Sequence, residues 1–330
     1  MGDGACLGIC FTDHELLYAV HQPGTLRGSA SQGNSSQGGT SRGRTSQGNS
    51  IQVSASQGST SQTGKYHHRP SLEIQHTGCQ EFSFRIRDVL TAGDSGLFDL
   101  VATSIRRIKD RFPATEARIL TPASEECWTI LPRSVYEHPS ERESHIRMLM
   151  EGVPREELTV TWEPVSNSDF KLLAIRRKSS ITPFEKLLKD FTHTEYFSEY
   201  EIGTLWQQLT GMSGSFMHIH CQKNYLSVSS HILGKLRGVA VIPTQTMEDL
   251  PYLWTLHASR LPWMKGIHEK IYLYGPEADS VSAMLHTQWE DAGDTVLLHS
   301  FDAMTITAPE KTVGFKLESA FPAILLSVAQ

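Results

Sequence analysis

The chain has 330 residues, and its 30 Lys and Arg side chains against 36 Asp and Glu give a formal net charge of −6. This balance argues against general nucleic-acid binding, because neutralising phosphates requires a concentrated excess of basic groups. The five cysteines are an odd number and include no C-x-x-C pair, so we expect reduced thiols rather than a disulfide framework or a structural zinc site. No apolar run approaches the ~18 residues of a membrane span. We therefore expect a cytoplasmic protein without a membrane-spanning segment.

The first predicted structure is a β-hairpin. Two short apolar runs at residues 7–11 and 16–20 are separated by four polar residues, which is the pattern of paired strands. In residues 24–64, Ser-Gln-Gly or a close variant then recurs every five residues. This repeat contains five apolar side chains in 41 residues, too few to offset its ordering entropy. We expect a disordered Ser/Gln/Gly-rich insertion in a hairpin loop.

The segments after the repeat predict strand meanders, helices and single strands in the same order twice. The first series contains strands at 71–75 and 81–87, a helix over 97–111, a strand at 118–121, an apolar segment at 129–132, a helix over 141–151, and strands at 158–163 and 170–176. The second series contains a helix over 199–209, strands at 215–220, 225–230 and 235–242, a helix over 246–261, a strand at 270–274, a helix over 279–291, a strand at 295–298 and a terminal helix over 319–328. The pattern predicts two similar α/β halves facing each other, at residues 1–198 and 199–330.

Short motifs accompany this order. Gly8 and Ile9 lie in the first hairpin, His218 and Asn224 in the second, and Gly275 between a predicted strand and helix. In this order and these motifs the chain resembles the actin-like ATPase superfamily, and within it the bacterial PilM-like pilus-assembly and GspL-like type II secretion scaffold proteins and short bacterial proteins related to them. The resemblance implies an α/β, actin-like fold of two ribonuclease-H-like halves facing a nucleotide cleft.

The chain departs from the family pattern at the positions that carry its chemistry. In that family, each half begins with a hairpin whose glycines let backbone amides approach phosphates and whose aspartate holds a hydrated magnesium ion. Here Cys10 and His218 stand where the two aspartates belong, and Thr12 and His220 where the turn glycines belong. The resemblance therefore assigns no catalytic residue, and it places at degenerate nucleotide-cleft positions Gly8, Cys10, Thr12, His218, His220, Asn224 and Gly275.

These departures favour a non-catalytic scaffold or regulatory adaptor, a pseudo-ATPase that needs no cofactor and has a protein partner. One alternative is an ATP-binding protein with little or no hydrolysis. Another is a metal-dependent hydrolase built on His218 and His220, because residues two apart on a strand face the same side. H-x-H alone is a weak metal motif, so we expect no bound metal.

Two further groups of residues have structural and functional interpretations. Cys10 or Cys221 could be a nucleophile only with a base from elsewhere, and a cysteine in an apolar strand is more often a core residue. Trp254 has helical spacing with neighbouring leucines and is predicted to lie in the core. Trp263, beside Pro262, is the better candidate for an interface anchor. The basic run at 176–178 is expected to be a solvated strand end.

Overall fold

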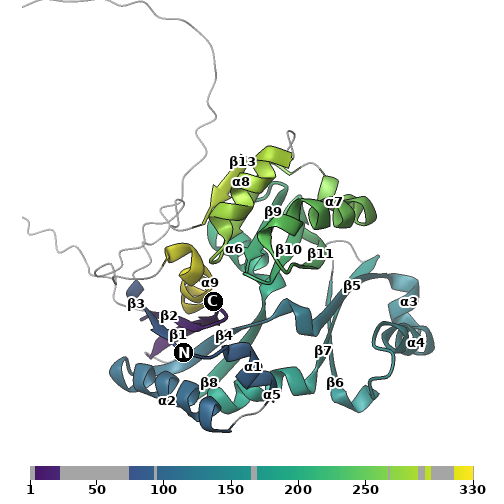
Figure 1. The fold of residues 1–330 in the computed structure, drawn as a ribbon. Helices are drawn as coiled ribbons and strands as arrows, with labels where there is room; N and C mark the ends of the chain where they lie inside the picture. Colours follow the sequence, from purple (N-terminus) through teal and green to yellow (C-terminus); the bar gives the residue numbers. More distant parts are fainter. Residues whose placement is uncertain are drawn as a thin grey trace, which may run out of the picture. The chain divides into compact units, whose positions relative to one another are not determined.

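The computed structural model describes residues 4–22, 74–92, 95–164, 169–266, 268–288, 294–298 and 316–329. The repeat at residues 24–64 lies outside these ranges, so its predicted disorder stays a prediction. Within them the strands form two five-stranded sheets and one three-stranded sheet, with helices between and around them (Figure 1). The mixed α/β architecture expected from the sequence is confirmed.

The first five-stranded sheet has the order β3-β2-β1-β4-β8. Its strands are β1 (Ala5–Phe11), β2 (Glu15–His21), β3 (Ile74–Glu81), β4 (Ala114–Thr121) and β8 (His193–Ser198). The first three form an antiparallel meander, and β4 and β8 continue the sheet parallel to β1. Since alternate side chains of β1 face opposite ways, Leu7 and Ile9 pack under the helices α2 (Ser95–Arg111) and α5 (Lys178–Leu187). The short helix α1 (Ile86–Ala92) precedes α2.

The second five-stranded sheet repeats this order as β11-β10-β9-β12-β13. Its strands are β9 (Phe216–Cys221), β10 (Tyr225–Ile232), β11 (Lys235–Pro243), β12 (Lys270–Tyr274) and β13 (Asp294–Leu297). One face packs against α7 (Leu250–Arg260) and α8 (Ala278–Gln288), where Trp254 is buried as predicted. Trp263 is half-buried against Gly238 of β11, so its ring packs on the protein's own sheet rather than standing out as a partner anchor.

A three-stranded antiparallel sheet, which the sequence does not predict as a separate unit, is inserted between β4 and β8. Its order is β5-β7-β6, with β5 (Glu126–Pro132), β6 (Leu158–Pro164) and β7 (Phe170–Arg177). The helices α3 (Arg133–Glu137) and α4 (Pro139–Leu149) lie beside it, and Ile146 of α4 packs against Leu173 and Ile175 of β7 (Figure 1). The inserted unit thus has a small core of its own.

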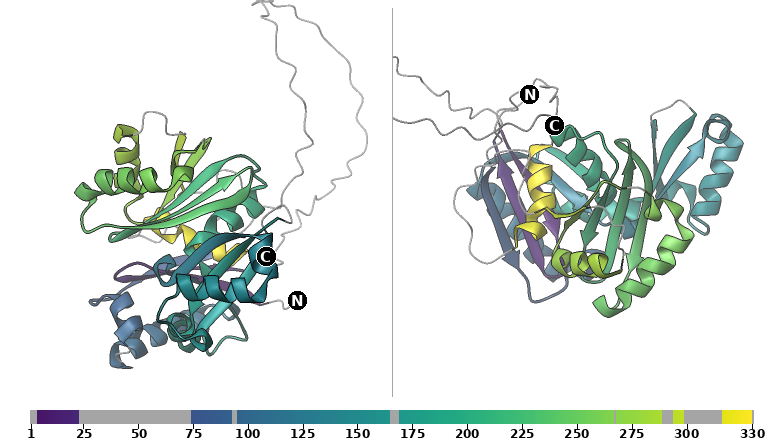
Figure 2. Two further views of the ribbon diagram at one scale, coloured as in Figure 1. Left: turned by 90° about the vertical axis from the view of Figure 1, so that its right-hand side faces the viewer. Right: turned by 90° about the horizontal axis from the view of Figure 1, so that it is seen from above.

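The terminal helix α9 (Leu317–Val328) lies between the two five-stranded sheets (Figure 2). Ten of its residues are buried, which explains its apolar sequence. It packs on β1, β2 and β4 of the first sheet, and with α6 (Ile202–Thr210) it contacts aromatic side chains of β9 and β12. Both faces of both large sheets are therefore covered. Among the helices of the described ranges, none is long and apolar enough to cross a bilayer.

Several predicted boundaries differ from the structure. Residues 74–81 form the single strand β3 where the sequence predicts strands at 71–75 and 81–87. The strand β8 and the helices α1 and α5 have no counterpart among the predictions, whereas the second half follows the predicted order throughout.

Candidate functional site

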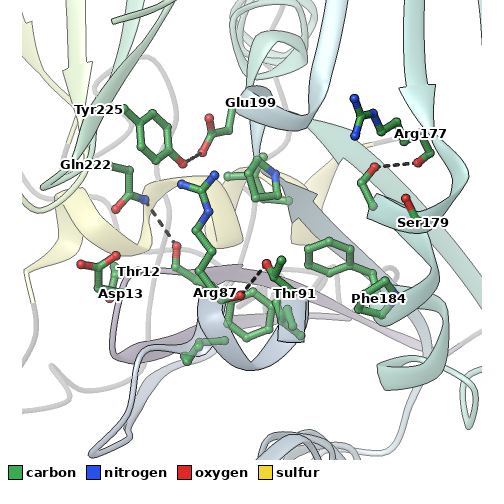
Figure 3. Close-up of a pocket in the computed structure, with 17 residues that line it drawn as sticks. Thr12, Asp13, Arg87, Thr91, Arg177, Ser179, Phe184, Glu199, Gln222 and Tyr225 are labelled. Carbon is green, nitrogen blue, oxygen red and sulfur yellow. Dashed lines mark hydrogen bonds between the residues drawn. The ribbon is translucent and has the colours of Figure 1, made fainter. Parts of the chain in front are cut away.

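A cavity of about 290 Å³ opens where several strands end (Figure 3). Its wall includes Phe11 at the end of β1, Leu120 near the end of β4, Glu199 directly after β8, and Gln222 directly after β9. In open α/β sheets, ligands bind in the crevice outside the carboxyl ends of strands, at the point where the strand order reverses. The cavity occupies this position, and helices α1 and α5, the β1–β2 turn and the start of β10 also contribute to its wall.

The turns of the two hairpins touch each other beside this cavity. In the β1–β2 turn, the Thr12 amide donates to the Glu15 carbonyl oxygen at 3.0 Å. Asp13 in the same turn accepts from the Asn224 amide nitrogen at 3.2 Å for Oδ2 and 3.4 Å for Oδ1. The side-chain amide of Gln222 donates to the Phe11 carbonyl oxygen at 3.4 Å. Side chains of the β9–β10 turn therefore bridge directly to the β1–β2 turn, and we call this contact the hairpin bridge.

The buried Glu199 residue holds the second hairpin in place through hydrogen bonds to His220 of β9 and Tyr225 of β10. Its side chain is 3% exposed, and Oε1 accepts from the Tyr225 hydroxyl at 2.6 Å and from His220 Nδ1 at 3.0 Å. Its other oxygen accepts from the Ala123 backbone amide at 3.1 Å. Since the Gln222 amide donates to His220 Nε2 at 3.0 Å, the neutral imidazole carries its proton on Nδ1, facing the carboxylate. Burial, and then the Glu199 charge, raises the pKa of Tyr225 well above its usual value, so this hydroxyl remains a donor.

The first-half residues that the sequence assigned to the cleft lie mostly away from the cavity. Only Thr12 lines it. Gly8 and Cys10 face α9 instead: a Cβ atom on Gly8 would lie 1.9 Å from the Ala323 carbonyl oxygen, and the Cys10 thiol lies 3.7 Å from the Ser319 carbonyl oxygen. Burial raises the pKa of Cys10 to about 12, which describes an inert core thiol rather than a nucleophile.

The second-half residues divide in a similar way. Asn224 and His220 belong to the hydrogen bonds described above, whereas His218 is 1% exposed among aromatic rings. Gly275 has φ +105°, a conformation that favours glycine, and its amide donates to the Glu318 carbonyl oxygen at 2.9 Å. A Cβ atom there would lie 2.6 Å from the Cys221 carbonyl oxygen. Gly275 thus joins β12 closely to β9 and to the start of α9.

These positions do not fit a magnesium-bound triphosphate held by the two hairpins. The residue at each former aspartate position is buried, Cys10 under α9 and His218 in the aromatic core. The space between the hairpin turns is crossed by the hairpin bridge. For the alternative metal site, both ring nitrogens of His220 are engaged, by Glu199 and by Gln222, and His218 is buried among aromatic rings. The described part of the chain contains no group of three His, Cys, Asp or Glu side chains arranged to hold an ion.

The polar side chains around the cavity were missed by the sequence analysis. They are Asp13, Arg87, Thr91, Arg177, Ser179, Ser180, Glu199, Gln222 and Tyr225. All but Thr91, which is in the last turn of α1, lie at a strand end, in a turn, or in the first turn of a helix, and these places are brought together only by the tertiary fold. The available signal was position: Asp13 follows Thr12 in the first turn, and Glu199 begins the helix predicted over 199–209.

The comparisons with known proteins concern the fold. No protein-family model and no curated protein sequence matches the chain. Among solved structures, the PilM–PilN type IV pilus biogenesis complex is similar at a TM-score of 0.62 and 11% identity, covering 98% of this chain and 96% of that chain. A Bacteroides thetaiotaomicron protein with an actin-like ATPase fold is similar at a TM-score of 0.45 and 9% identity, covering 90% of this chain and 91% of that chain. The cytoplasmic domain of EpsL, an inner-membrane component of the Vibrio cholerae type II secretion system, is similar at a TM-score of 0.43 and 10% identity. The match covers 95% of this chain and 97% of that chain.

Taken with the strand order that occurs twice, the similarity to PilM shows the fold at a sequence identity too low to show more. The chain therefore has the actin-like ATPase fold, built from two ribonuclease-H-like halves, and resembles that superfamily as its sequence predicts.

Proposed function

We propose that this protein is a non-catalytic actin-like scaffold or regulatory adaptor that works through a protein partner and needs no nucleotide. The hairpin bridge is the observation that carries the proposal. In an actin-like ATPase the phosphates lie between the two hairpins, whereas here Asn224 donates directly to Asp13 across that space. Phosphates would have to break this contact before they could approach the backbone amides of the turns.

The cleft carboxylates support the same conclusion. Glu199 already accepts three hydrogen bonds, from Tyr225, His220 and the Ala123 amide. Asp13 accepts from Asn224 and forms an ion pair with Arg85 at 3.2 Å. Without a carboxylate available to position magnesium, charge that develops on a transferred phosphoryl group is poorly stabilised. A scaffold role also agrees with the similarity to PilM, which was solved in a complex with PilN.

The alternative of ATP binding without rapid hydrolysis is favoured by one feature, the cavity at the strand ends, because its wall includes Arg87 of α1 and Arg177 of β7. The metal-dependent hydrolase has no such feature in its favour, since His220 is occupied by Glu199 and His218 lies in the aromatic core.

A phosphate-release assay with magnesium and ATP tests the proposal, together with the melting temperature in the presence and absence of the nucleotide. We expect no steady turnover and no thermal shift, for the natural chain and for the Asp13→Ala/Asn224→Ala variant in which the hairpin bridge is removed. Steady turnover that Asp13→Ala or Glu199→Gln abolishes would contradict the scaffold proposal. A thermal shift without turnover would favour the ATP-binding alternative. The Arg155→Gln variant, whose ion pair with Glu143 lies on the surface, is the control for contaminating hydrolases.

A further inference from the structure

We propose that the cavity at the strand ends binds a small amphipathic anion: a carboxylate or phosphate held at Arg177 and the first turn of α5, with an apolar body on the cavity floor. The inference goes beyond the scaffold proposal, which needs no ligand. It rests on three properties of the cavity: an arginine that has no acidic partner among the described residues, an excess of guanidinium groups over free carboxylates in the wall, and an apolar floor.

The unpaired charge is on Arg177. The neighbouring Arg176 forms ion pairs with Glu126 at 2.9 Å and Glu201 at 3.1 Å. In contrast, within the described ranges no acidic side chain pairs with the guanidinium of Arg177, which lines the cavity. An arginine presents a planar set of donors that matches a carboxylate or a phosphate. Such a group would pair with a charge that has no acidic partner among the described residues.

The first turn of α5 adds donors at the same wall. The helix has ten residues and no side chain caps its N-terminus, so its first backbone N–H groups have no side-chain acceptor. Three residues of this turn line the cavity: Arg177 at the N-cap, Ser179 and Ser180 (Figure 3). The positive end of the helix dipole therefore lies at the same wall of the cavity as Arg177, and both favour an anion.

Arg87 brings a second guanidinium into the cavity from α1. It donates to the Ser124 hydroxyl at 2.9 Å and lies 5.9 Å from the centre of the Tyr225 ring. Asp13 is paired with Arg85, whereas Glu199 keeps its negative charge because its three donors are a hydroxyl, an imidazole and a backbone amide, so two guanidinium groups face one carboxylate. The balance of available groups in the cavity is thus toward donors and positive charge.

The floor and the size define the rest of the ligand. Apolar side chains form the floor: Phe11, Ile86, Leu90, Leu120, Pro122, Pro183 and Phe184. Small-molecule sites typically enclose ~300–1,000 Å³ and are mostly apolar with a few polar groups that fix orientation. At about 290 Å³ the cavity is slightly smaller than that range, so it suits a ligand with one anionic group and a compact apolar body.

Fluorescence titration with anilinonaphthalene sulfonate, an aromatic anion, tests this site on the full chain. We expect saturable binding that Arg177→Gln weakens about ten-fold, because a hydrogen bond to a charged group is lost. Thr91→Trp, at an exposed position on the cavity wall, should block binding by filling the space. Lys178→Gln is the matched control: it removes the adjacent exposed charge, which does not line the cavity, and should change affinity by less than about two-fold.

Competition identifies the anionic group. Phenylpropionate and phenyl phosphate should displace the probe, and whichever does so at the lower concentration shows which group the site prefers, while the neutral phenylpropanol should not displace it. Equal displacement by the alcohol, or binding that neither Arg177→Gln nor Thr91→Trp alters, would overturn the proposal. Displacement by magnesium ATP at a lower concentration than by either small acid would also overturn it, in favour of nucleotide binding. The scaffold proposal is judged separately, by phosphate release.

Discussion

Two histidines of the second half, His218 and His231, are enclosed by aromatic side chains. His231 stacks on Phe216 with ring centres 4.6 Å apart, and His218 lies 5.0 Å from the Tyr272 ring. Within the described part of the chain, no side chain or backbone group hydrogen-bonds to either imidazole. Burial lowers the pKa of His231 to about 3 and that of His218 well below its usual value. Both rings are therefore neutral in the folded protein at any physiological pH.

We expect these histidines to destabilise the fold in acid. The unfolded chain binds a proton at each histidine below about pH 6.5 and the folded chain does not, so the free energy of unfolding falls as pH drops from 6.5 toward 3. With a folded pKa of about 3, His231 alone should remove about 2 kcal/mol between pH 7.5 and pH 5. Urea unfolding at both pH values should show a smaller difference for His231→Leu than for the natural chain.

Two comparisons make this measurement specific. Glu126, whose pKa burial raises to about 7 despite the Arg176 charge, acts in the opposite direction, because the folded state retains its proton more firmly. The pH dependence of the unfolding free energy of the variant must therefore be compared with that of the natural chain, and not with a slope calculated from His231 alone. His193→Gln, at an exposed position on β8, is the control and should leave the pH difference unchanged. An equal pH difference in His231→Leu and the natural chain would contradict the prediction.

The same residues show what sequence reasoning could find at this scale. The H-x-H pattern of β9 correctly places His218 and His220 on one face of a strand, since both point to the side opposite α7 and α8. Their different environments depend on distant partners, Glu199 beside one and Tyr272 beside the other. No local pattern encodes those partners.

At the scale of elements, α9 explains why Gly8 is a glycine. The helix lies so close to β1 that a Cβ atom on Gly8 would overlap the backbone of Ala323. A motif that the resemblance relates to phosphate binding is here used for helix packing. The apolar sequence of residues 319–328 predicts the helix, but it cannot tell that both sheets share it, because that requires the fold of the whole chain.

Arg118 of β4 holds the end of this helix, and we expect its loss to destabilise the protein. Its guanidinium donates to the Leu326 carbonyl oxygen at 3.2 Å and to that of Ala329, and it forms an ion pair with Glu195 at 2.6 Å. The side chain is 14% exposed, so removing it leaves helix carbonyls without this partner. Arg118→Met should lower the free energy of unfolding by about 2 to 4 kcal/mol.

Arg118→Lys should recover only part of this stability, because a single ammonium group cannot donate to the two helix carbonyls and pair with Glu195 at the same time, as Nη1 and Nε of the arginine do. The surface pair of Arg155 and Glu143 is the control: both side chains are about half exposed, and Arg155→Met should change stability by less than about 1 kcal/mol. Chemical denaturation measures all three variants. If Arg118→Met and Arg155→Met lowered the free energy of unfolding equally, the contact between Arg118 and α9 would contribute no more to stability than a surface ion pair.

The elements that the sequence analysis missed have identifiable causes. The strand β8 is short and mostly polar, because it is an edge strand with exposed positions that give no apolar run. The helix α5 contains Pro183, which lowers its local helix signal although Phe184 and Leu187 are buried under β1. The second half was easier to predict, because β9 and β10 are buried at nearly every position and each contains several apolar residues close together.

At the scale of the whole molecule, the two halves are held together at three places. The hairpin bridge joins the turns, Glu199 joins the second hairpin to Ala123, and α9 fills the space between the large sheets. In all three places the contacts are made by the protein's own side chains and backbone, so these contacts link the two halves directly.

The repeat at residues 24–64 should be dispensable for this assembly. The strands on either side, β2 and β3, are antiparallel neighbours with His21 opposite Ile74, and the side-chain amides of Gln22 and Gln75 hydrogen-bond at 2.8 Å. Antiparallel neighbours need only a few connecting residues, so a chain that lacks 24–64 can still close the hairpin. The shorter loop should lower the entropic free-energy cost of closing the hairpin by about 1 kcal/mol. The variant should therefore melt at the same temperature as the full chain or slightly above it. A variant of the same length with the repeat residues shuffled is the control and should melt like the natural chain. If the deletion melts well below both, the repeat contributes packing that its composition does not predict.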